Sequence, residues 1–464
     1  MRRYLLGALF VVAMIPSTHC GSLCLAADPP PLVKVPNPTS GDNPTYPLVP
    51  QALPQAGKSF QDARFKTALV RVTEERGLRH EYSRHDPFNC DGTKILLTHT
   101  ASGEFRVYRT GKLPYDANEG LVTKVDLEEP RWDPANADLL WGSRDFQIRT
   151  LNVKTGRSDV VKDFAKDPTI APVLKAETDL YRVTMKDEGE TSRDKRYWAM
   201  CLQGSKDDYR LRYIAVWDRK EDKVVGLCKV AKEESDIDWV GMSVLGNWVL
   251  IGGGSENGPR LSGMTMADRG LTKFHRLDYA TAHADIGLDS QGNEVIVMQN
   301  VRTDAIDLIP LSEKTKPILD AGGSYEGTGR TMLVRLFYSN ESPVGLSSGV
   351  HICCNADGWC VVSTYMPSGA KEQNWLDRCV ILVRLDPRAP AAYYLAKIHN
   401  TRDAYWEEPH ASMSSDGSKV VWACNWNQDV GKEKAFLIQL NMPAKWQEAL
   451  SAPKGQPTTG DVKK

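Results

Sequence analysis

A short unit, a tight polar turn followed by an apolar or β-branched run, recurs along the chain. The three clearest copies are CDGTKILL, ADGWCVVS and SDGSKVVW, which begin at Cys90, Ala356 and Ser415. Weaker copies begin at Ala135, Ser192, Leu245 and Ser290. Asp-Gly and Gly-Asn favour hairpin turns, and the run after each turn has the composition of a strand. Seven copies of one unit constrain the fold more than any single element does.

Each copy is followed by a second strand pattern with its own polar turn. Examples lie at residues 148–164, 213–230 and 380–398. Two hairpins per unit give four strands, and the units are roughly 45 to 65 residues long. The sequence therefore predicts an all-β fold, a seven-bladed β-propeller of four-stranded antiparallel blades. A two-domain β protein is the alternative.

The last unit is one strand short. Residues 435–442 (AFLIQLNM) form its third strand pattern, and the repeat ends there. The segment ALVRVT at residues 68–73 precedes the first unit and has the pattern of an unassigned strand. We expect it to complete the last blade as its outer strand and so to close the ring.

The ends of the chain differ in composition from the repeats. Residues 1–27 carry two early arginines, an apolar run over residues 5–15 and small residues at 26 and 27, the pattern of a secretory signal peptide. Residues 28–59 are rich in proline and are expected to form a linker or a surface arm. The propeller is expected over residues 60–445, with a flexible tail over 446–464. We expect a secreted or periplasmic protein without a membrane span.

The charge balance disfavours one class of partner. Lys and Arg number 58 against 59 Asp and Glu, a net charge of -1. Domains that bind nucleic acid through bulk charge carry a basic excess, so we expect no nucleic-acid partner. Separately, we expect the protein to be a monomer. The sequence also lacks a P-loop, a dinucleotide fingerprint and HExxH.

Several histidines share one position in the repeat. His85, His351 and His410 each lie seven residues before the turn glycine of their unit. In the unit that begins at Ser290 the same offset gives Asp285, with His283 on the same strand face. Equivalent positions on neighbouring blades converge at the central channel, so we expect these side chains to meet at one mouth.

Three imidazoles around one point predict a metal site at His283, His351 and His410. Imidazole suits zinc, manganese or iron-like ions, and a nearby carboxylate such as Asp285 or Glu408 favours the harder ones. We therefore expect a divalent ion, with manganese, zinc or calcium as candidates. The alternative is that these histidines line the channel as structural, hydrogen-bonded residues.

The same offset leads to further candidates. It gives Trp239 in the unit that begins at Leu245. In the second unit EPRW (residues 129–132) parallels EEPH (407–410), which puts Arg131 in the place of His410. The third unit offers Tyr181 nearby, with a looser alignment.

Two segments carry a resemblance to a known family. YWEEPHASMSSDGSKVVWACNW (residues 405–426) resembles the last blade of oligogalacturonate lyases and, more loosely, TolB-like propellers. YSRHDPFNCDGTKILL (residues 82–97) is similar to the first blade of propeller polysaccharide lyases, including ulvan lyases. The oligogalacturonate lyases hold a divalent ion, typically manganese, with several His and a Gln, and use a His base. The resemblance implies His283, His351 and His410 as the ligands here; the Gln and a close His-x-His pair have no evident counterpart.

The reaction that this resemblance implies is β-elimination at a uronic acid. A base removes the proton beside the carboxylate while a cation neutralises the developing charge. His85 is the candidate base, Arg131 or a His-bound metal the carboxylate partner, and Tyr181 a candidate acid. Trp132, Trp239 and Trp406 are candidates for stacking on sugar rings. The expected partner is a uronate-containing glycan; the alternative is a non-enzymatic propeller that binds a glycan or a protein at the same mouth.

Overall fold

A computed structural model describes most of the chain. The described residues are 32–40, 43–207, 209–234, 236–254, 260–280, 282–320, 322–336, 349–366, 369–372, 374–400, 405–428 and 434–451. The expected signal peptide (residues 1–27) and most of the expected tail (residues 452–464) lie outside them. Among the described residues, no helix combines the length and the apolar character needed to cross a membrane.

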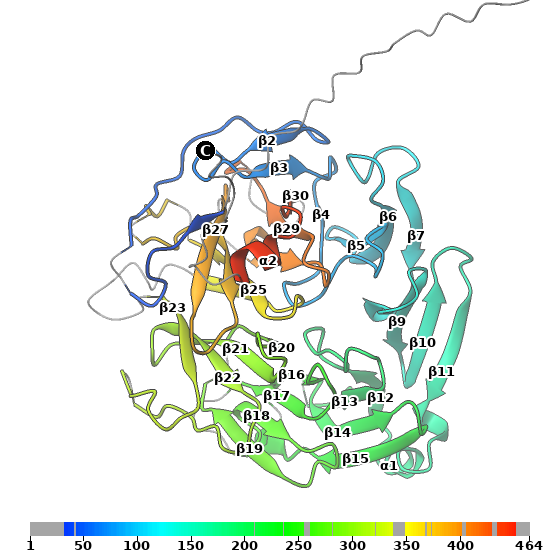
Figure 1. The fold of residues 1–464 in the computed structure, drawn as a ribbon. Helices are drawn as coiled ribbons and strands as arrows, with labels where there is room; N and C mark the ends of the chain where they lie inside the picture. The colour runs from blue at the N-terminus through cyan, green and yellow to red at the C-terminus, as the bar shows by residue number, and fades with distance from the viewer. Residues whose placement is uncertain are drawn as a thin grey trace, which may run out of the picture.

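Seven antiparallel sheets stand in a ring, as Figure 1 shows, and confirm the predicted seven-bladed propeller. Blades 1 to 3 consist of β4 (Leu78–Arg79), β5 (Lys94–His99), β6 (Glu104–Arg109) and β7 (Leu121–Val125); β8 (Glu128–Trp132), β9 (Leu139–Arg144), β10 (Gln147–Asn152) and β11 (Ser158–Asp163); and β12 (Leu180–Thr184), β13 (Tyr197–Gly204), β14 (Leu211–Asp218) and β15 (Lys223–Lys229). Blades 4 and 5 consist of β16 (Ile237–Met242), β17 (Val249–Gly253), β18 (Gly263–Ala267) and β19 (Phe274–Asp278); and β20 (Ala284–Leu288), β21 (Glu294–Asn300), β22 (Ala305–Pro310) and β23 (Thr331–Arg335).

The last two blades each gain a strand from the N-terminal region. Blade 6 consists of β24 (Gly349–Cys353), β25 (Trp359–Tyr365), β26 (Cys379–Arg384), β27 (Ala391–Lys397) and β1 (Val33–Lys34). Blade 7 consists of β28 (Ser412–Met413), β29 (Lys419–Cys424), β30 (Phe436–Asn441), β3 (Ala68–Arg71) and β2 (Ser59–Gln61). The described helices are α1 (Ala171–Ala176), α2 (Trp446–Ser451) and the 3₁₀ turns Phe164–Lys166, Lys232–Glu234 and Tyr405–Glu407.

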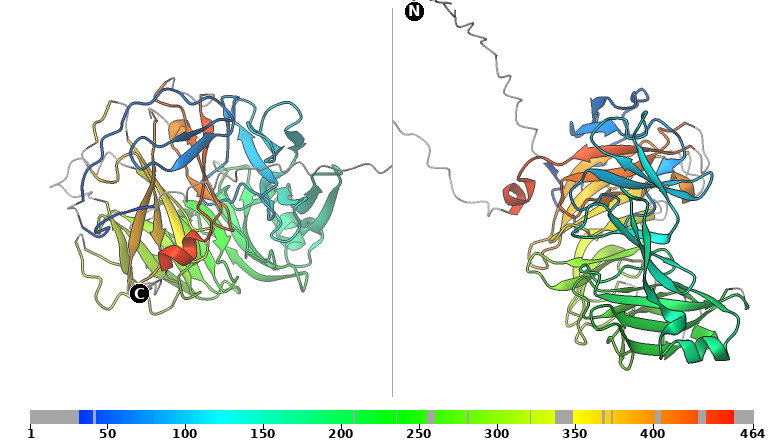
Figure 2. Two further views of the ribbon diagram at one scale, coloured as in Figure 1. Left: turned by 45° about the horizontal axis from the view of Figure 1, so that its top comes forward. Right: turned by 90° about the vertical axis from the view of Figure 1, so that its right-hand side faces the viewer.

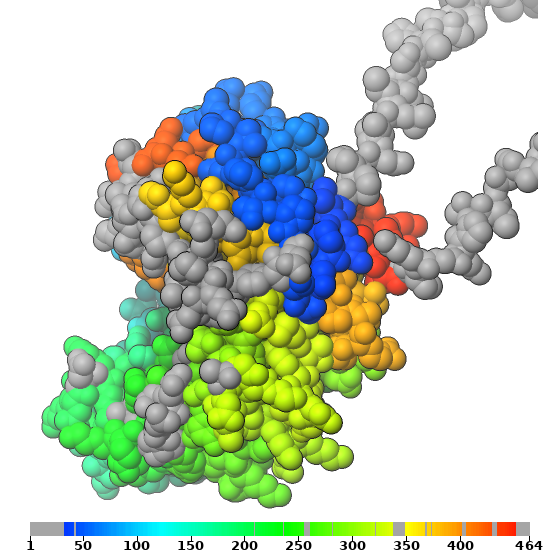
Figure 3. Space-filling model, turned by 90° about the vertical axis from the view of Figure 1, so that its left-hand side faces the viewer, coloured from blue at the N-terminus to red at the C-terminus, as the bar shows by residue number. Residues whose placement is uncertain are grey.

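The predicted ring closure is confirmed by β3. This strand pairs antiparallel with β30, with Leu69 opposite Leu440. The proline-rich segment ahead of it crosses the outer edges of blades 6 and 7, where β1 pairs with β27. Figure 3 shows this segment, in dark blue, on the outer surface of the ring. Val35 and Phe65 are buried in the core between blades 5 and 6, so residues 33–40 and 43–71 form a strap that holds the closed ring from outside.

Hydrophobic side chains fill the spaces between the blades. Seven clusters of buried residues occupy the described part of the ring, one between each pair of neighbouring blades. Trp198 and Trp217 lie in the cluster between blades 2 and 3, and Trp239 and Met298 in the one between blades 4 and 5. Both faces of each sheet are therefore apolar, and the channel at the axis is left for polar residues.

The recurring turn needs a left-handed backbone. Gly92, Gly246, Gly292 and Gly417 have φ between 67° and 81°, and each amide donates a hydrogen bond to the carbonyl three residues before it. This φ region suits glycine because a Cβ atom meets the following carbonyl there. In blade 3 the same position and the same hydrogen bond belong to Lys195, with φ 58°.

Candidate functional site

Two cavities lie at opposite ends of the inner strands. The larger, of about 420 Å³, is lined by residues that follow these strands, among them Asp133 after β8, Asn355 after β24 and Asp416 after β28. The smaller, of about 240 Å³, is lined by residues at the strand starts, including Asp238 and His283. The short helix α2, on one face of the ring in Figure 2, belongs to the side of the larger cavity, because the Trp446 indole donates to the carbonyl of Gly417 at 2.9 Å.

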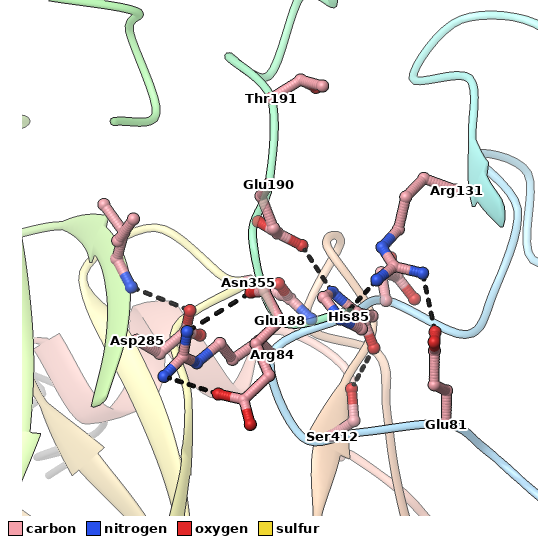
Figure 4. Close-up of polar contacts among 12 residues, drawn as sticks. Glu81, Arg84, His85, Arg131, Glu188, Glu190, Thr191, Asp285, Asn355 and Ser412 are labelled. Carbon is pink, nitrogen blue, oxygen red and sulfur yellow. Dashed lines mark hydrogen bonds and ion pairs between the residues drawn. The ribbon is translucent and has the colours of Figure 1, made fainter. Parts of the chain in front are cut away.

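His85 lies between Glu190 and Arg131 beside the larger cavity (Figure 4). Its Nδ1 is 3.1 Å from Glu190 Oε1, and its Nε2 is 2.6 Å from Arg131 Nη2. Arg131 also donates to Glu81 Oε2 at 2.6 Å and to the Asp187 carbonyl at 2.7 Å. Arg131 and Glu190 line the cavity, while His85 is buried behind them.

The Nε2 atom of His85 has two polar neighbours. Besides Arg131 Nη2, which can only donate, it lies 2.8 Å from the Asp187 carbonyl oxygen, which can only accept. Burial alone would raise the pKa of Glu190. The hydrogen bond with His85 and the positive charges around the carboxylate, Lys195 and Arg131 among them, together outweigh burial and hold the pKa of Glu190 below its usual range. The group is thus a carboxylate that orients the His85 ring from its Nδ1 side, with an arginine and a backbone carbonyl on its Nε2 side.

A buried carboxylate holds the loop that carries Glu190. Glu129 accepts hydrogen bonds from Thr184 Oγ1 at 2.6 Å, from the Met185 amide at 3.0 Å and from the Asp187 amide at 2.9 Å. Its own backbone is left-handed, with φ 50°. Such strain persists where surrounding contacts determine it. Glu129 therefore positions residues 184–190, which supply both Glu190 and the Asp187 carbonyl.

Arg84 occupies the axis next to this group. Its Nη2 is 3.2 Å from Glu188 Oε2, and its guanidinium lies 4.3 Å from the ring centroid of Trp239. Asp285 accepts hydrogen bonds from the amides of Cys354 and Ile286, and burial raises its pKa well above the usual range. Asp285 therefore acts as a hydrogen-bond acceptor for backbone amides. Among the described residues, the group that could hold a metal ion does not include Asp285.

The predicted histidine cluster forms at the other end of the channel. The rings of His351 and His410 are 3.9 Å apart between centroids, and those of His283 and His351 are 4.4 Å apart. Glu408 Oε2 lies 2.8 Å from His351 Nε2 and 3.5 Å from His410 Nε2. His351, Glu408 and His410 offer ligand atoms within 4.8 Å of one another. His283 packs on His351 outside this three-ligand group.

The donor set fits a divalent transition metal. Two imidazoles and one carboxylate are ligands for manganese, iron or zinc, whereas calcium prefers oxygen ligands alone. Arg79, which sequence reasoning missed, contacts His410 Nδ1, so the proton of His410 sits on Nε2 facing Glu408. An ion that binds Nε2 must displace that proton. Burial, with the nearby His351, lowers the pKa of His283 to about 3, which keeps it neutral.

Tyr82 separates the two groups. Its ring centroid is 4.9 Å from that of His410 and 6.4 Å from that of His85. His85 therefore belongs to the group at the larger cavity and does not join the other three histidines at one mouth.

The remaining candidates have different surroundings. Tyr181 donates to Gln203 Oε1 at 2.9 Å and lines neither cavity described above. Trp132 lines the larger cavity, with its indole donating to the Pro87 carbonyl. Trp239 is 1% exposed and covered by Arg84, so it packs the core rather than offering a face to a sugar. Trp406 is half-buried and packs edge-on against Tyr405.

The sequence did not reveal Glu190, because its turn carries no glycine. The offset of seven residues, counted back from Lys195, reaches Glu188, and Glu190 follows two residues later in the loop after β12. A positive φ at a lysine leaves no signal in the sequence, so the third unit was aligned on Tyr181 instead. Knowledge that Lys195 occupies the turn position would have placed both glutamates at the channel.

Solved structures share this fold. The oligogalacturonate lyase of Vibrio parahaemolyticus matches with a TM-score of 0.52 and 10% identity, over 84% of this chain and 97% of that one. An oligogalacturonate lyase in complex with manganese matches with a TM-score of 0.52 and 12% identity, over the same shares. No protein-family model and no curated protein matches the chain. The chain thus resembles oligogalacturonate lyases in its propeller fold, as its sequence predicted.

Proposed function

We propose that the protein is a secreted or periplasmic lyase that cleaves uronate-containing glycans by β-elimination, with assistance from a divalent metal. The observation that carries this proposal is the Glu190–His85–Arg131 group beside the larger cavity. It combines a histidine oriented by a carboxylate with a cation beside it, both of which proton abstraction next to a carboxylate requires. The fold shared with oligogalacturonate lyases supports the same reaction class.

In the proposed reaction Arg131 binds the uronate carboxylate. A carboxylate that takes the hydrogen bond of Arg131 Nη2 frees the Nε2 lone pair of His85, which then accepts the proton beside the carboxylate. Glu190 stabilises the imidazolium that forms, because its carboxylate lies 3.1 Å from Nδ1. Trp132 lines the same cavity and can contact a sugar ring. A divalent ion held by His351, His410 and Glu408 would supply positive charge at the other end of the channel.

The test is a panel of uronate polysaccharides and oligosaccharides, followed by absorbance of the unsaturated product with and without added manganese. We expect product from at least one uronate glycan and none from neutral glycans. A second candidate, a non-enzymatic glycan-binding propeller, is favoured by the contacts of Arg131 and the Asp187 carbonyl with His85 Nε2, which occupy the atom that would act as the base. Binding without any unsaturated product would support that second candidate.

A metal prediction follows from the three-ligand group. We expect one divalent ion per chain in protein purified with added manganese or zinc, measured by elemental analysis. His351→Ala and Glu408→Ala should lose it, because two remaining donors bind weakly. His275→Ala is the matched control, since His275 lies on β19 with Nε2 2.7 Å from the Thr315 carbonyl. Equal metal content in all four proteins would contradict the site.

A second prediction concerns Glu129. Glu129→Gln removes acceptors for the loop of residues 184–190 and shifts Glu190 relative to His85. We expect kcat to fall by about 10²-fold, the scale of a small misplacement of reacting groups, with a changed pH profile and a near-normal KM. Glu128→Gln is the control, because Glu128 pairs with Arg182 at the surface at 2.9 Å. A wild-type pH profile in Glu129→Gln would show that Glu129 has no positioning role.

A further inference from the structure

Lys195 stands where other repeats have glycine. Gly92, Gly246, Gly292 and Gly417 make the same turn with the same amide hydrogen bond, and only the lysine carries a side chain there. A left-handed φ is unfavourable for a residue with a Cβ atom. A lysine at this position therefore adopts a strained conformation that a glycine would avoid, and such strain concentrates at functional sites.

The backbone of Lys195 is held firmly in that conformation. Its amide donates to the Ser192 carbonyl at 2.8 Å. Its carbonyl accepts from the Trp198 indole at 3.0 Å and from Arg219 Nε at 2.7 Å. These three contacts fix the direction in which the side chain leaves the turn.

The side chain lines the larger cavity together with Arg131 and Glu190. Within the described part of the chain its ammonium group donates no hydrogen bond and forms no ion pair. Burial lowers the pKa of Lys195 to about 8, with Glu190 acting to raise it and Arg131 to lower it. The ammonium is thus a cation available to a ligand in the cavity, and it can release its proton near neutral pH.

The two arginines that line the same cavity cannot release a proton near neutral pH. Arg131 is paired with Glu81, and Arg193 is paired with Asp357 at 2.7 Å. Guanidinium groups also keep their protons at any physiological pH. Tyr181, the acid suggested by the sequence, bonds to Gln203 away from the cavity. The larger cavity therefore has a single lysine in position to give up a proton.

We propose that Lys195 is the general acid of the elimination, donating its proton to the leaving glycosidic oxygen. The step rests on the function proposed above. His85 Nε2 takes the proton from the carbon beside the carboxylate, and that electron pair forms the carbon–carbon double bond. The bond to the leaving oxygen breaks, and the oxygen takes a proton from Lys195 Nζ. Lys195 ends neutral and His85 charged, and exchange of one proton with water restores both.

Two substitutions test this role. Lys195→Gly restores the repeat's usual turn residue, so we expect a higher Tm together with a kcat lower by about 10²- to 10⁴-fold. Lys195→Arg keeps the charge but not the transferable proton, so we expect a similar fall in kcat with KM within a few-fold of wild type. The kcat of the wild type should fall as pH rises through about 8, because the acid must be protonated, and Lys195→Arg should lack this limb. Lys445→Gly is the control, since Lys445 also has φ 58° but is exposed, and its kcat should be unchanged.

The outcomes separate the two proposals. A wild-type protein that cleaves no uronate glycan overturns the proposed function and the role of Lys195 with it. An active wild type with a fully active Lys195→Arg variant, or with the high-pH limb retained in that variant, overturns the role of Lys195 alone. Loss of kcat in Lys195→Gly together with a raised Tm supports the role of Lys195 as general acid. If Lys195 were purely structural, its replacement would not lower kcat while raising Tm.

Discussion

A chain that begins at residue 74 should fail to form a stable propeller. It lacks β2 and β3, so blade 7 keeps three strands and the edge of β30 is left open. An open strand edge is a template for pairing with other chains. It also loses the strap residues Val35 and Phe65 from the core between blades 5 and 6. We expect aggregation, measured as loss of the monomer peak in size-exclusion chromatography with light scattering.

A shorter deletion is the control for this experiment. A chain that begins at residue 56 keeps β2 and β3 and loses β1, along with the edge contact of Tyr46 with Tyr394 at 5.4 Å and the Gln51 carbonyl that Trp426 contacts. We expect a monomer with a lower Tm than the full chain. Equal solubility and equal Tm for the two truncated chains would refute the closure role of β3.

The second large effect should come from His85→Ala. Removal of the base should lower kcat on a uronate glycan by about 10²- to 10⁴-fold. Folding should be retained, because the hydrogen bond from Ser412 Oγ goes to the His85 carbonyl, which alanine keeps. The measurement is kcat and KM from initial rates over substrate concentrations that span KM, with circular dichroism as the check on folding.

Glu190→Gln tests how much the negative charge of Glu190 contributes at the same site. The amide keeps an acceptor for His85 Nδ1 but removes the charge that stabilises the imidazolium, so its loss of kcat should be smaller than that of His85→Ala. His275→Ala, on the outer strand of blade 4, should leave kcat unchanged. A His85→Ala variant with the wild-type rate would move the base to another residue and end the role assigned to the Glu190–His85–Arg131 group.

Most of the architecture could be predicted because the blades repeat. Asp-Gly or Gly-Asn turns mark the first hairpin in five of the seven units, and the strand over residues 68–73 stood out as unassigned. The strand β1 could not be predicted, since two residues in a proline-rich segment have no periodicity. Its pairing depends on the edge that β27 presents only in the folded ring.

The histidine cluster could be predicted from the repeat as well, but the other contacts of the site could not. The repeat offset brought His283, His351 and His410 together, because equivalent positions converge on the axis. It did not show that Tyr82 lies between His410 and His85, since an offset gives a position in the repeat but not the depth along the channel. Glu129 and Arg79 act across blade boundaries, and Lys195 replaces a glycine; none of these relations leaves a pattern in the sequence.

The strap also determines when the protein can acquire its sites during synthesis. Leu69 and its partner Leu440 are separated by roughly 370 residues, which take about 20–70 s to synthesise at ~5–20 residues per second. Through that interval β3 can pair only with β2, because its other partner β30 has not been made, and β1 must wait for β27. The larger cavity takes Ser415 and Asp416 from blade 7, so it is not complete before that blade has been made. Ligand binding in the larger cavity can therefore report only on chains whose last blade has formed, and the edge of β3 that pairs with β30 stays open until then.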